Sequence, residues 1–284
     1  MTSLGLYRFS LLVVFATLLL ILAGGLVTSH DAGLAVPDWP TSYGQWFPPM
    51  VGNVFWEHGH RMIAGTVGLL TLILAFWVQV KETRKGLKIF GWILVGMVLM
   101  QALLGGLTVL YLLPPAVSIA HACLAQTFFC AVVAMAYFLQ QNPVRTLAGQ
   151  ADPGLARLRR LLVMTTAFIY LQLILGAILR HGGPDFFVVA HILGAFLVLI
   201  HVLLVFLRVL RFYEKEKALL KAALSLGVST ICQVFLGMGA FIFTRMMTAG
   251  FSPSHAEVLF TASHQTLGAV VLAACFLMTL MVWR

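Results

Sequence analysis

The sequence predicts an all-α polytopic membrane protein whose eight transmembrane helices form two tandem, pseudo-symmetric four-helix bundles. Of its 284 residues, 61% are hydrophobic and only 10% are charged, which is far too apolar for a soluble domain of this length. The apolar residues form runs long enough to cross a bilayer as helices. Motifs in the first four runs recur in the last four at a nearly constant offset, which is typical of an internal duplication.

The apolar runs mark the expected helices in order. The first run is longer than the roughly 7–15 apolar residues of a signal peptide, and no Ala-x-Ala cleavage site follows it, so we expect a retained helix. The long connection after it, about residues 29–56, is rich in Pro, Trp and Phe and should not be a continuous helix. It is either a structural cap or a lid over a site in the first half. The eight helices are expected near residues 8–28, 58–80, 88–111, 116–138, 158–180, 187–208, 219–243 and 257–283.

The net charge of +9 is distributed unevenly along the chain. Fifteen of the 18 basic residues fall in alternate connections and at the chain ends, and only Arg61, Arg180 and Arg245 fall on the other side. The positive-inside rule therefore predicts a multi-pass protein of the cell inner membrane with both termini in the cytoplasm. Because the positive charge lies in short loops beside membrane spans, we expect membrane lipid as a partner and no nucleic acid.

The four cysteines, Cys123, Cys130, Cys232 and Cys275, all fall inside the expected helices. Their spacing matches no zinc or Cys-x-x-Cys motif, and none lies in an outer loop where an oxidising compartment would pair them. We interpret them as small buried apolar residues.

Two signatures alternate along the chain. Odd-numbered helices share a Gln-x-x-Leu-Gly pattern, at 101–105, 172–176 and 233–237, with a looser match at 21–25, and even-numbered helices share a histidine. His191 follows His60 by 131 residues, and Gln233 follows Gln101 by 132 residues. We therefore expect an N-terminal half at residues 1–140, a cytoplasmic linker at 141–157 and a C-terminal half at 158–284.

Four histidines are expected about one turn into the even helices, near the outer face of the membrane. They are His60, His121, His191 and His264. An ionisable residue inside a span is costly and suggests a functional site. Zinc usually takes three or four converging protein ligands, whereas a haem iron takes one from each face, so two histidines in each half favour one haem per half. The residues four positions after them are all small, which suits either a macrocycle or close helix packing: Ala64, Ala125, Ala195 and Gly268.

The second helix adds a charged motif, Glu-His-Gly-His-Arg at residues 57–61. Glu57 shares a helix face with His60 and Arg61, while His58 points elsewhere. Glu57 is either an acid or base held beside a ligand or one half of an ion pair with Arg61. The corresponding position of the second half is Val188, so only the first half carries this carboxylate.

The three arginines on the outer side, Arg61, Arg180 and Arg245, allow two interpretations. Arginine binds carboxylates such as haem propionates bidentately. It also anchors helices at the membrane interface. We keep the three residues as candidate propionate contacts.

With the 57–61 motif and the other three histidines in place, almost the whole chain resembles the haem A synthase family. That family oxidises the C8 methyl of haem O to a formyl group through two successive hydroxylations, giving haem A for cytochrome oxidase. The resemblance implies that His60 and His121 hold the substrate haem O and that Glu57 is the catalytic carboxylate. It implies that His191 and His264 hold a haem b cofactor in the C-terminal half. A haem O synthase and an external electron acceptor, a quinone or another, are the partners it implies.

The sequence departs from the family in one respect. Many members carry a cysteine pair in the first outer loop, and this chain has none between residues 29 and 56. A di-haem electron-transfer protein of the membrane cytochrome b type is the alternative function, and Glu57 beside His60 is the feature that argues against it. A transporter is a weaker alternative, because the polar residues gather at one face rather than at the midplane. A homo-oligomer is left open.

Overall fold

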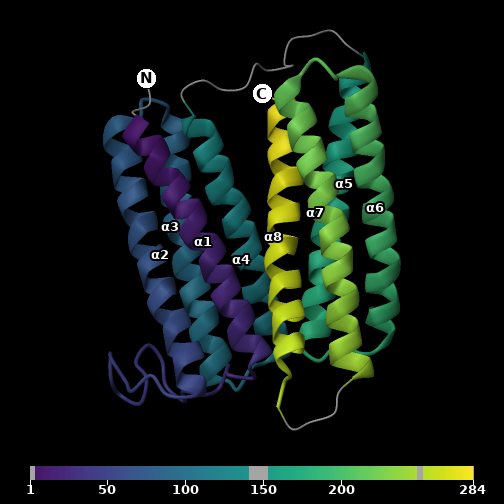
Figure 1. The fold of residues 1–284 in the computed structure, drawn as a ribbon. Helices are drawn as coiled ribbons and strands as arrows, with labels where there is room; N and C mark the ends of the chain where they lie inside the picture. The colour runs from purple at the N-terminus through teal and green to yellow at the C-terminus, as the bar shows by residue number, and fades with distance from the viewer. Residues whose placement is uncertain (1–3, 141–152, 248–251, 284) are drawn as a thin grey trace. The chain divides into compact units, whose positions relative to one another are not determined.

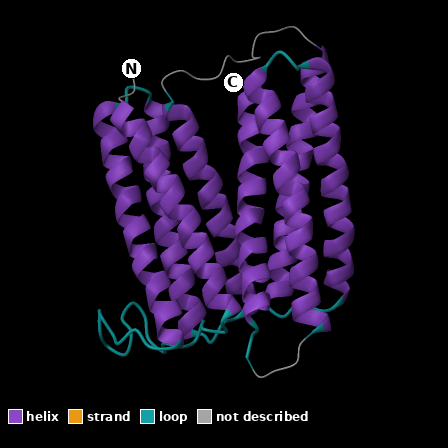
Figure 2. Ribbon diagram, in the orientation of Figure 1, coloured by secondary structure: helices purple, strands orange, loops and turns teal. Residues whose placement is uncertain are grey.

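The computed structural model describes residues 4–140, 153–247 and 252–283 (Figure 1). Across these residues eight helices are long and apolar enough to cross a membrane, which confirms the predicted all-α, multi-pass class (Figure 2). The helices are α1 (Leu4–Ser29), α2 (Asn53–Lys81), α3 (Lys85–Leu110), α4 (Pro115–Leu139), α5 (Pro153–Arg180), α6 (Phe186–Phe212), α7 (Lys217–Phe241) and α8 (His255–Trp283), and α7 continues into a π-helical turn, η1 (Ile242–Met246).

Several helices extend beyond the apolar runs that predict them. α2 begins at Asn53 rather than near residue 58, and α5 begins at Pro153, inside the segment predicted as a linker. Pro is well suited to the first position of a helix, where its missing N–H has no partner to lose. Hydropathy marks only the membrane-buried part of a helix, so polar end turns are missed. Residues 141–152 of the predicted linker lie outside the described part of the chain.

The first four helices form a closed ring. α1 neighbours α2 and α4, and α3 also neighbours α2 and α4, so consecutive helices alternate in direction as in an up-down bundle (Figure 1). α2 and α4 therefore lie diagonally across the bundle. This arrangement allows side chains from those two helices to approach a common interior.

The apolar core of this bundle lies away from the histidines. Its fully buried residues come from the start of α1 and α3 and from the later turns of α2 and α4, which share one end of the bundle. They are Leu6, Val13, Val67, Leu74, Val78, Leu94, Phe128, Val132, Met135 and Leu139. Packing of these side chains stabilises that end and leaves the opposite half of the bundle to the half-buried His60 and His121.

By its internal contacts the chain divides into two compact units, residues 1–141 with 236–266 and residues 142–235 with 267–284. In the second unit, α5 and α6 are neighbours and the last turns of α8 pack on α5. There the Arg159 Nε donates to the Val282 carbonyl at 2.8 Å, and the Thr166 and Thr279 hydroxyls lie 3.2 Å apart. The division into two equal tandem halves stays a prediction.

Candidate functional site

Each of the four predicted histidines packs against a glycine of the preceding odd helix. A Cβ atom added to that glycine would lie only about 3 Å from the imidazole Cε1. The distances are 3.2 Å for Gly24 and His60, 3.2 Å for Gly105 and His121, 3.1 Å for Gly176 and His191, and 2.8 Å for Gly237 and His264. At all four sites a residue without a side chain makes room for the ring.

A glutamine one turn before the glycine holds the same even helix. The Gln101 Nε2 donates to the His121 carbonyl oxygen at 2.9 Å, and Gln172 makes the same bond to the His191 carbonyl. These bonds fix the backbone of the even helix at the histidine itself. In both cases the glutamine of the Gln-x-x-Leu-Gly signature holds the backbone of the histidine, and the glycine contacts its imidazole ring.

The pattern in the sequence did not predict this function of the signature. The signal that identifies it is the alternation of the two signatures, since each odd helix with the glycine is followed by an even helix with the histidine. The small residues four positions after the histidines are only partly explained. Gly268 lies against Gln233, where an added Cβ would be 3.1 Å from the amide nitrogen, so helix packing accounts for that position.

His60 and His121 come together within the first bundle. They lie on the diagonal helices α2 and α4, near enough for their rings to interact electrostatically. The Nδ1 of His60 is buried and has no hydrogen-bond partner within the described residues. Such an orphaned polar atom is costly unless a bound group changes its surroundings. A half-buried imidazole pair from facing helices fits the axial ligands of a haem.

The depths of the histidines are less uniform than predicted. His60 lies seven residues after the start of α2 and His264 nine residues after the start of α8, whereas His191 lies only five residues into α6. The reason is again that helices extend past their apolar runs. His264 and His191 fall in different compact units, and each contacts a glycine of its own unit. Their pairing stays a prediction.

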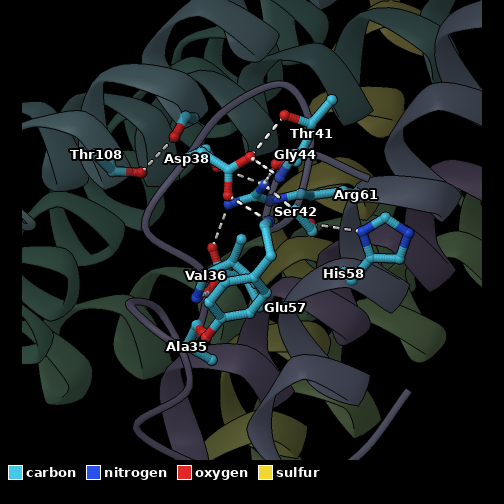
Figure 3. Close-up of polar contacts among 12 residues, drawn as sticks. Ala35, Val36, Asp38, Thr41, Ser42, Gly44, Glu57, His58, Arg61 and Thr108 are labelled. Atoms are coloured by element: carbon cyan, nitrogen blue, oxygen red, sulfur yellow. Dashed lines mark hydrogen bonds and ion pairs between the residues drawn. The ribbon is translucent and has the colours of Figure 1, made fainter. Parts of the chain in front are cut away.

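Glu57 is buried near the start of α2. Its Oε1 pairs with the Arg61 NH2 at 2.5 Å, and its Oε2 accepts a hydrogen bond from the Val36 backbone N–H at 2.8 Å (Figure 3). The ion pair between positions four apart is the one that helical spacing predicts. The carboxylate is therefore tied both to its own helix and to the outer loop.

Arg61 connects α2 to the outer loop. Its NH1 donates to the carbonyl oxygens of Asp38 and Thr41, at 2.8 and 2.6 Å, and approaches the Ser42 hydroxyl at 3.3 Å (Figure 3). Both terminal nitrogens of this candidate propionate contact are thus engaged within the protein. The other two candidates, Arg180 and Arg245, lie in the last turn of α5 and in η1.

The outer loop is folded around Asp38. Its carboxylate accepts hydrogen bonds from the Thr41 hydroxyl at 2.6 Å and from the backbone N–H groups of Tyr43 and Gly44 at 2.6 and 2.9 Å. These bonds lower the pKa of the Asp38 carboxyl from 3.8 to about 2. Ser42, which follows Thr41, has its hydroxyl 2.8 Å from the Nδ1 of His58. His58 therefore contacts the loop and points away from His60.

The same loop also reaches α3. The Trp39 indole packs on Gly106, where an added Cβ would lie 2.8 Å from the ring. Gly106 follows Gly105, the glycine against His121, so the loop is anchored beside the histidine site from two helices. This anchoring favours the cap over a freely moving lid. Trp46 and Phe47 at the far side of the loop are 67% and 81% exposed, which suits the predicted membrane interface.

The described ranges contain no group of three or more His, Cys, Asp or Glu side chains arranged to hold a metal ion. A haem iron needs only two such ligands from the protein. The residues at hand therefore fit axial haem ligation from α2 and α4.

Comparison with known proteins bears on the same residues. Residues 50–189, which include Glu57, His60 and His121, match the family described as "Cytochrome oxidase assembly protein". A protein named "Heme A synthase" from Exiguobacterium sibiricum is 28% identical over 182 residues, which cover 63% of this chain and 60% of the relative. The resemblance to the haem A synthase family is confirmed.

Two further bacterial proteins named "Heme A synthase" match at similar levels. The proteins of that name from Shewanella oneidensis and Brucella anthropi are 30% identical over 178 residues and 34% identical over 140 residues. These matches cover 56% and 44% of this chain, and 52% and 37% of the relatives. The chain thus spans about 60% or less of the length of the curated relatives it matches.

Proposed function

We propose that this protein is a haem A synthase of the bacterial cell membrane, which oxidises the C8 methyl of haem O to a formyl group through two successive hydroxylations. Haem O is held by His60 and His121, and a resident haem b by His191 and His264. The observation that carries the proposal is the pair of imidazoles on diagonal helices of one bundle, each placed by a glycine, with a buried carboxylate one turn from His60.

The protein's own side chains position the substrate. Gly24 and Gly105 admit the two imidazoles, and Gln101 fixes the backbone at His121, so both ligands are preorganised before haem O arrives. The apolar surface of the helices suits the farnesyl tail. The haem iron supplies the redox chemistry when it is bound. The loop anchored through Arg61 and Trp39 keeps water from the outer end of the bundle.

Glu57 is the proposed proton acceptor. It lies on the face of α2 that carries His60, three residues away, which places it one turn closer to the outer end. Removing hydrogen from a methyl group releases protons, and a buried carboxylate can accept one. Its bond to Val36 and its ion pair with Arg61 hold the carboxylate in place. The second half has Val188 at this position, which is why we assign it a retained cofactor.

The remaining partners follow from the chemistry. With water as the source of the oxygen atom, oxidation of the methyl to a formyl group releases more electrons than one haem iron can store, so an external acceptor, a quinone or another, must take them up. A haem bound by His191 and His264 would supply the redox chemistry to relay these electrons. Haem O is poorly soluble, so a haem O synthase in the same membrane is the expected donor. The termini are assigned to the cytoplasm and the haem sites to the outer side, on the distribution of basic residues.

The test compares two matched variants in cells that also express a haem O synthase. Glu57→Gln keeps an acceptor for the Val36 N–H but removes the proton acceptor. Glu82→Gln, at the other end of α2, removes a second buried carboxylate that pairs with an arginine, Arg84, at 2.7 Å. Haem A extracted from the Glu57→Gln protein should fall by about a hundredfold or more, with haem O still bound.

The Glu82→Gln protein should produce haem A at the wild-type level. Normal haem A production by Glu57→Gln would overturn the assignment of Glu57. Loss of bound haem in Glu57→Gln alone would instead make Glu57 a structural residue of the outer loop.

A further inference from the structure

We infer that the end of α5 and α6 farthest from the histidines carries a binding site for an anionic phospholipid. An open groove of about 420 Å³ lies there between the first turns of α5 and the last turns of α6. Its rim carries three arginines, Arg157, Arg208 and Arg211. We call it the α5–α6 groove, and all of its lining residues belong to one compact unit.

No described residue forms an ion pair with any of the three arginines. Arg208 and Arg211 each have the guanidinium carbon 5.3 Å from the centre of the Phe212 ring, so two positive charges contact the same aromatic side chain. The ion pairs of Glu57 with Arg61 and of Glu82 with Arg84 do not involve the groove. Like charges this close repel unless an anion lies between them.

The hydrogen bonds of the Arg208 guanidinium indicate where an anion would bind. One terminal nitrogen donates to the Gly154 carbonyl of α5 at 3.0 Å, which fixes the side chain across the groove. Its Nε is buried and has no hydrogen-bond partner in the part of the chain that the structure describes. A buried guanidinium N–H is a strong donor that is costly to leave unpaired. A phosphate oxygen in the groove would satisfy it.

The rest of the groove selects a lipid over a free phosphate. Its floor is formed by Leu161, Leu204 and Leu207, and the last two are each nearly half exposed. Leucines that continue from the arginines along the helices offer an apolar track for an acyl chain. The basic residues of the chain gather at this end, which the positive-inside rule assigns to the cytoplasmic leaflet, where anionic headgroups are found. A phosphatidylglycerol fits both the rim and the floor.

The test measures lipid binding to the delipidated protein by native mass spectrometry, with phosphatidylglycerol and phosphatidylcholine of the same acyl chains. The test variant combines Arg157→Gln and Arg211→Gln, which are both exposed and leave the bond from Arg208 to Gly154 intact. The control is Arg160→Gln, an exposed arginine of the same α5 end that does not line the groove. Phosphatidylglycerol should bind the wild type preferentially, and each groove arginine removed should lower its affinity about fivefold.

The control variant should bind phosphatidylglycerol as the wild type does. Equal binding of the two lipids would overturn the proposal, and so would an equal loss in the control, because that result means a general effect of net charge. Complete displacement of the lipid by millimolar inorganic phosphate would also contradict it, since the leucine floor would then contribute nothing.

Discussion

At the scale of single residues, the glycine opposite each histidine is the most constrained position of the site. The added Cβ contacts range from 2.8 to 3.2 Å, closer than most side-chain contacts in folded proteins. A methyl group there must push the imidazole away from its position. The fixed orientation of the ring is what a haem ligand requires, so we expect these glycines to control haem affinity rather than helix stability.

Gly105→Ala should weaken haem binding at the His60 and His121 site. The methyl would lie 3.2 Å from the His121 ring, and overpacking of this kind costs about 1–3 kcal/mol. Haem retained per purified protein is the measurement, read from the visible absorption spectrum. The matched control is Gly96→Ala in the same helix, where an added Cβ meets nothing within 4 Å. Equal haem content in both variants would contradict the proposed function of Gly105.

Asp38 gives the outer loop a defined dependence on pH. Its pKa is about 2 in the folded loop and 3.8 in the unfolded chain, so the ionised form stabilises the fold. This stabilisation is complete above the unfolded value and is lost as the pH falls through the folded value. The fluorescence of the loop tryptophans should be constant from neutral pH down to about pH 4 and change only below it. A transition near pH 6 would show that another group controls the loop.

Asp38→Asn is the control for this dependence. The amide keeps the size of the side chain but has no negative charge, so the loop should lose this stabilisation at every pH. The acid transition assigned to Asp38 should then disappear from the fluorescence profile.

At the scale of elements, the outer loop and α2 form one structural unit through Arg61. Three hydrogen bonds of Arg61 join α2 to the loop, and a fourth holds Glu57 within α2. Charge-assisted bonds of this kind contribute about 1.5–3 kcal/mol each. The sequence identified the helix and the loop but not their connection. Spacing along a helix predicts contacts three or four residues away, whereas the Asp38 carbonyl that Arg61 binds is 23 residues away.

Arg61→Gln should release the outer loop without unfolding the bundle. The loop loses its main anchor on α2, while Trp39 still contacts α3 at Gly106. Limited proteolysis in detergent should then cleave near residues 40–45 at least about tenfold faster than in the wild type. Arg84→Gln, which breaks the ion pair at the other end of α2, should leave cleavage of this loop unchanged.

At the scale of the whole molecule, composition and hydropathy were enough to predict the eight membrane-spanning helices that the described residues contain. Hydropathy reflects the free energy of placing each side chain in lipid, and this free energy determines where a helix enters the membrane. It does not report where the helix ends in water, so α2 and α5 begin about one turn earlier than predicted. The contact of His60 with Gly24 and the hydrogen bond from Val36 to Glu57 join residues far apart in the sequence, so local spacing does not predict them.

The orientation of the molecule provides a prediction at this scale. A cysteine introduced at Gln45, in the exposed outer loop, should react with a membrane-impermeant maleimide in intact cells. A cysteine introduced at Lys215, between α6 and α7, should react only after the cells are permeabilised. The opposite pattern would place the histidine end in the cytoplasm and contradict the assignment made from basic residues.

The central claim is that the histidine pair of the first bundle binds a haem whose methyl group is oxidised. The most direct measurement is mass analysis of the haems extracted from the wild-type protein after co-expression with a haem O synthase. The account predicts a haem with one more oxygen and two fewer hydrogens than haem O, and its loss in His121→Ala. Recovery of unmodified haems alone, from a protein saturated with haem, would contradict the account and favour an electron-transfer cytochrome.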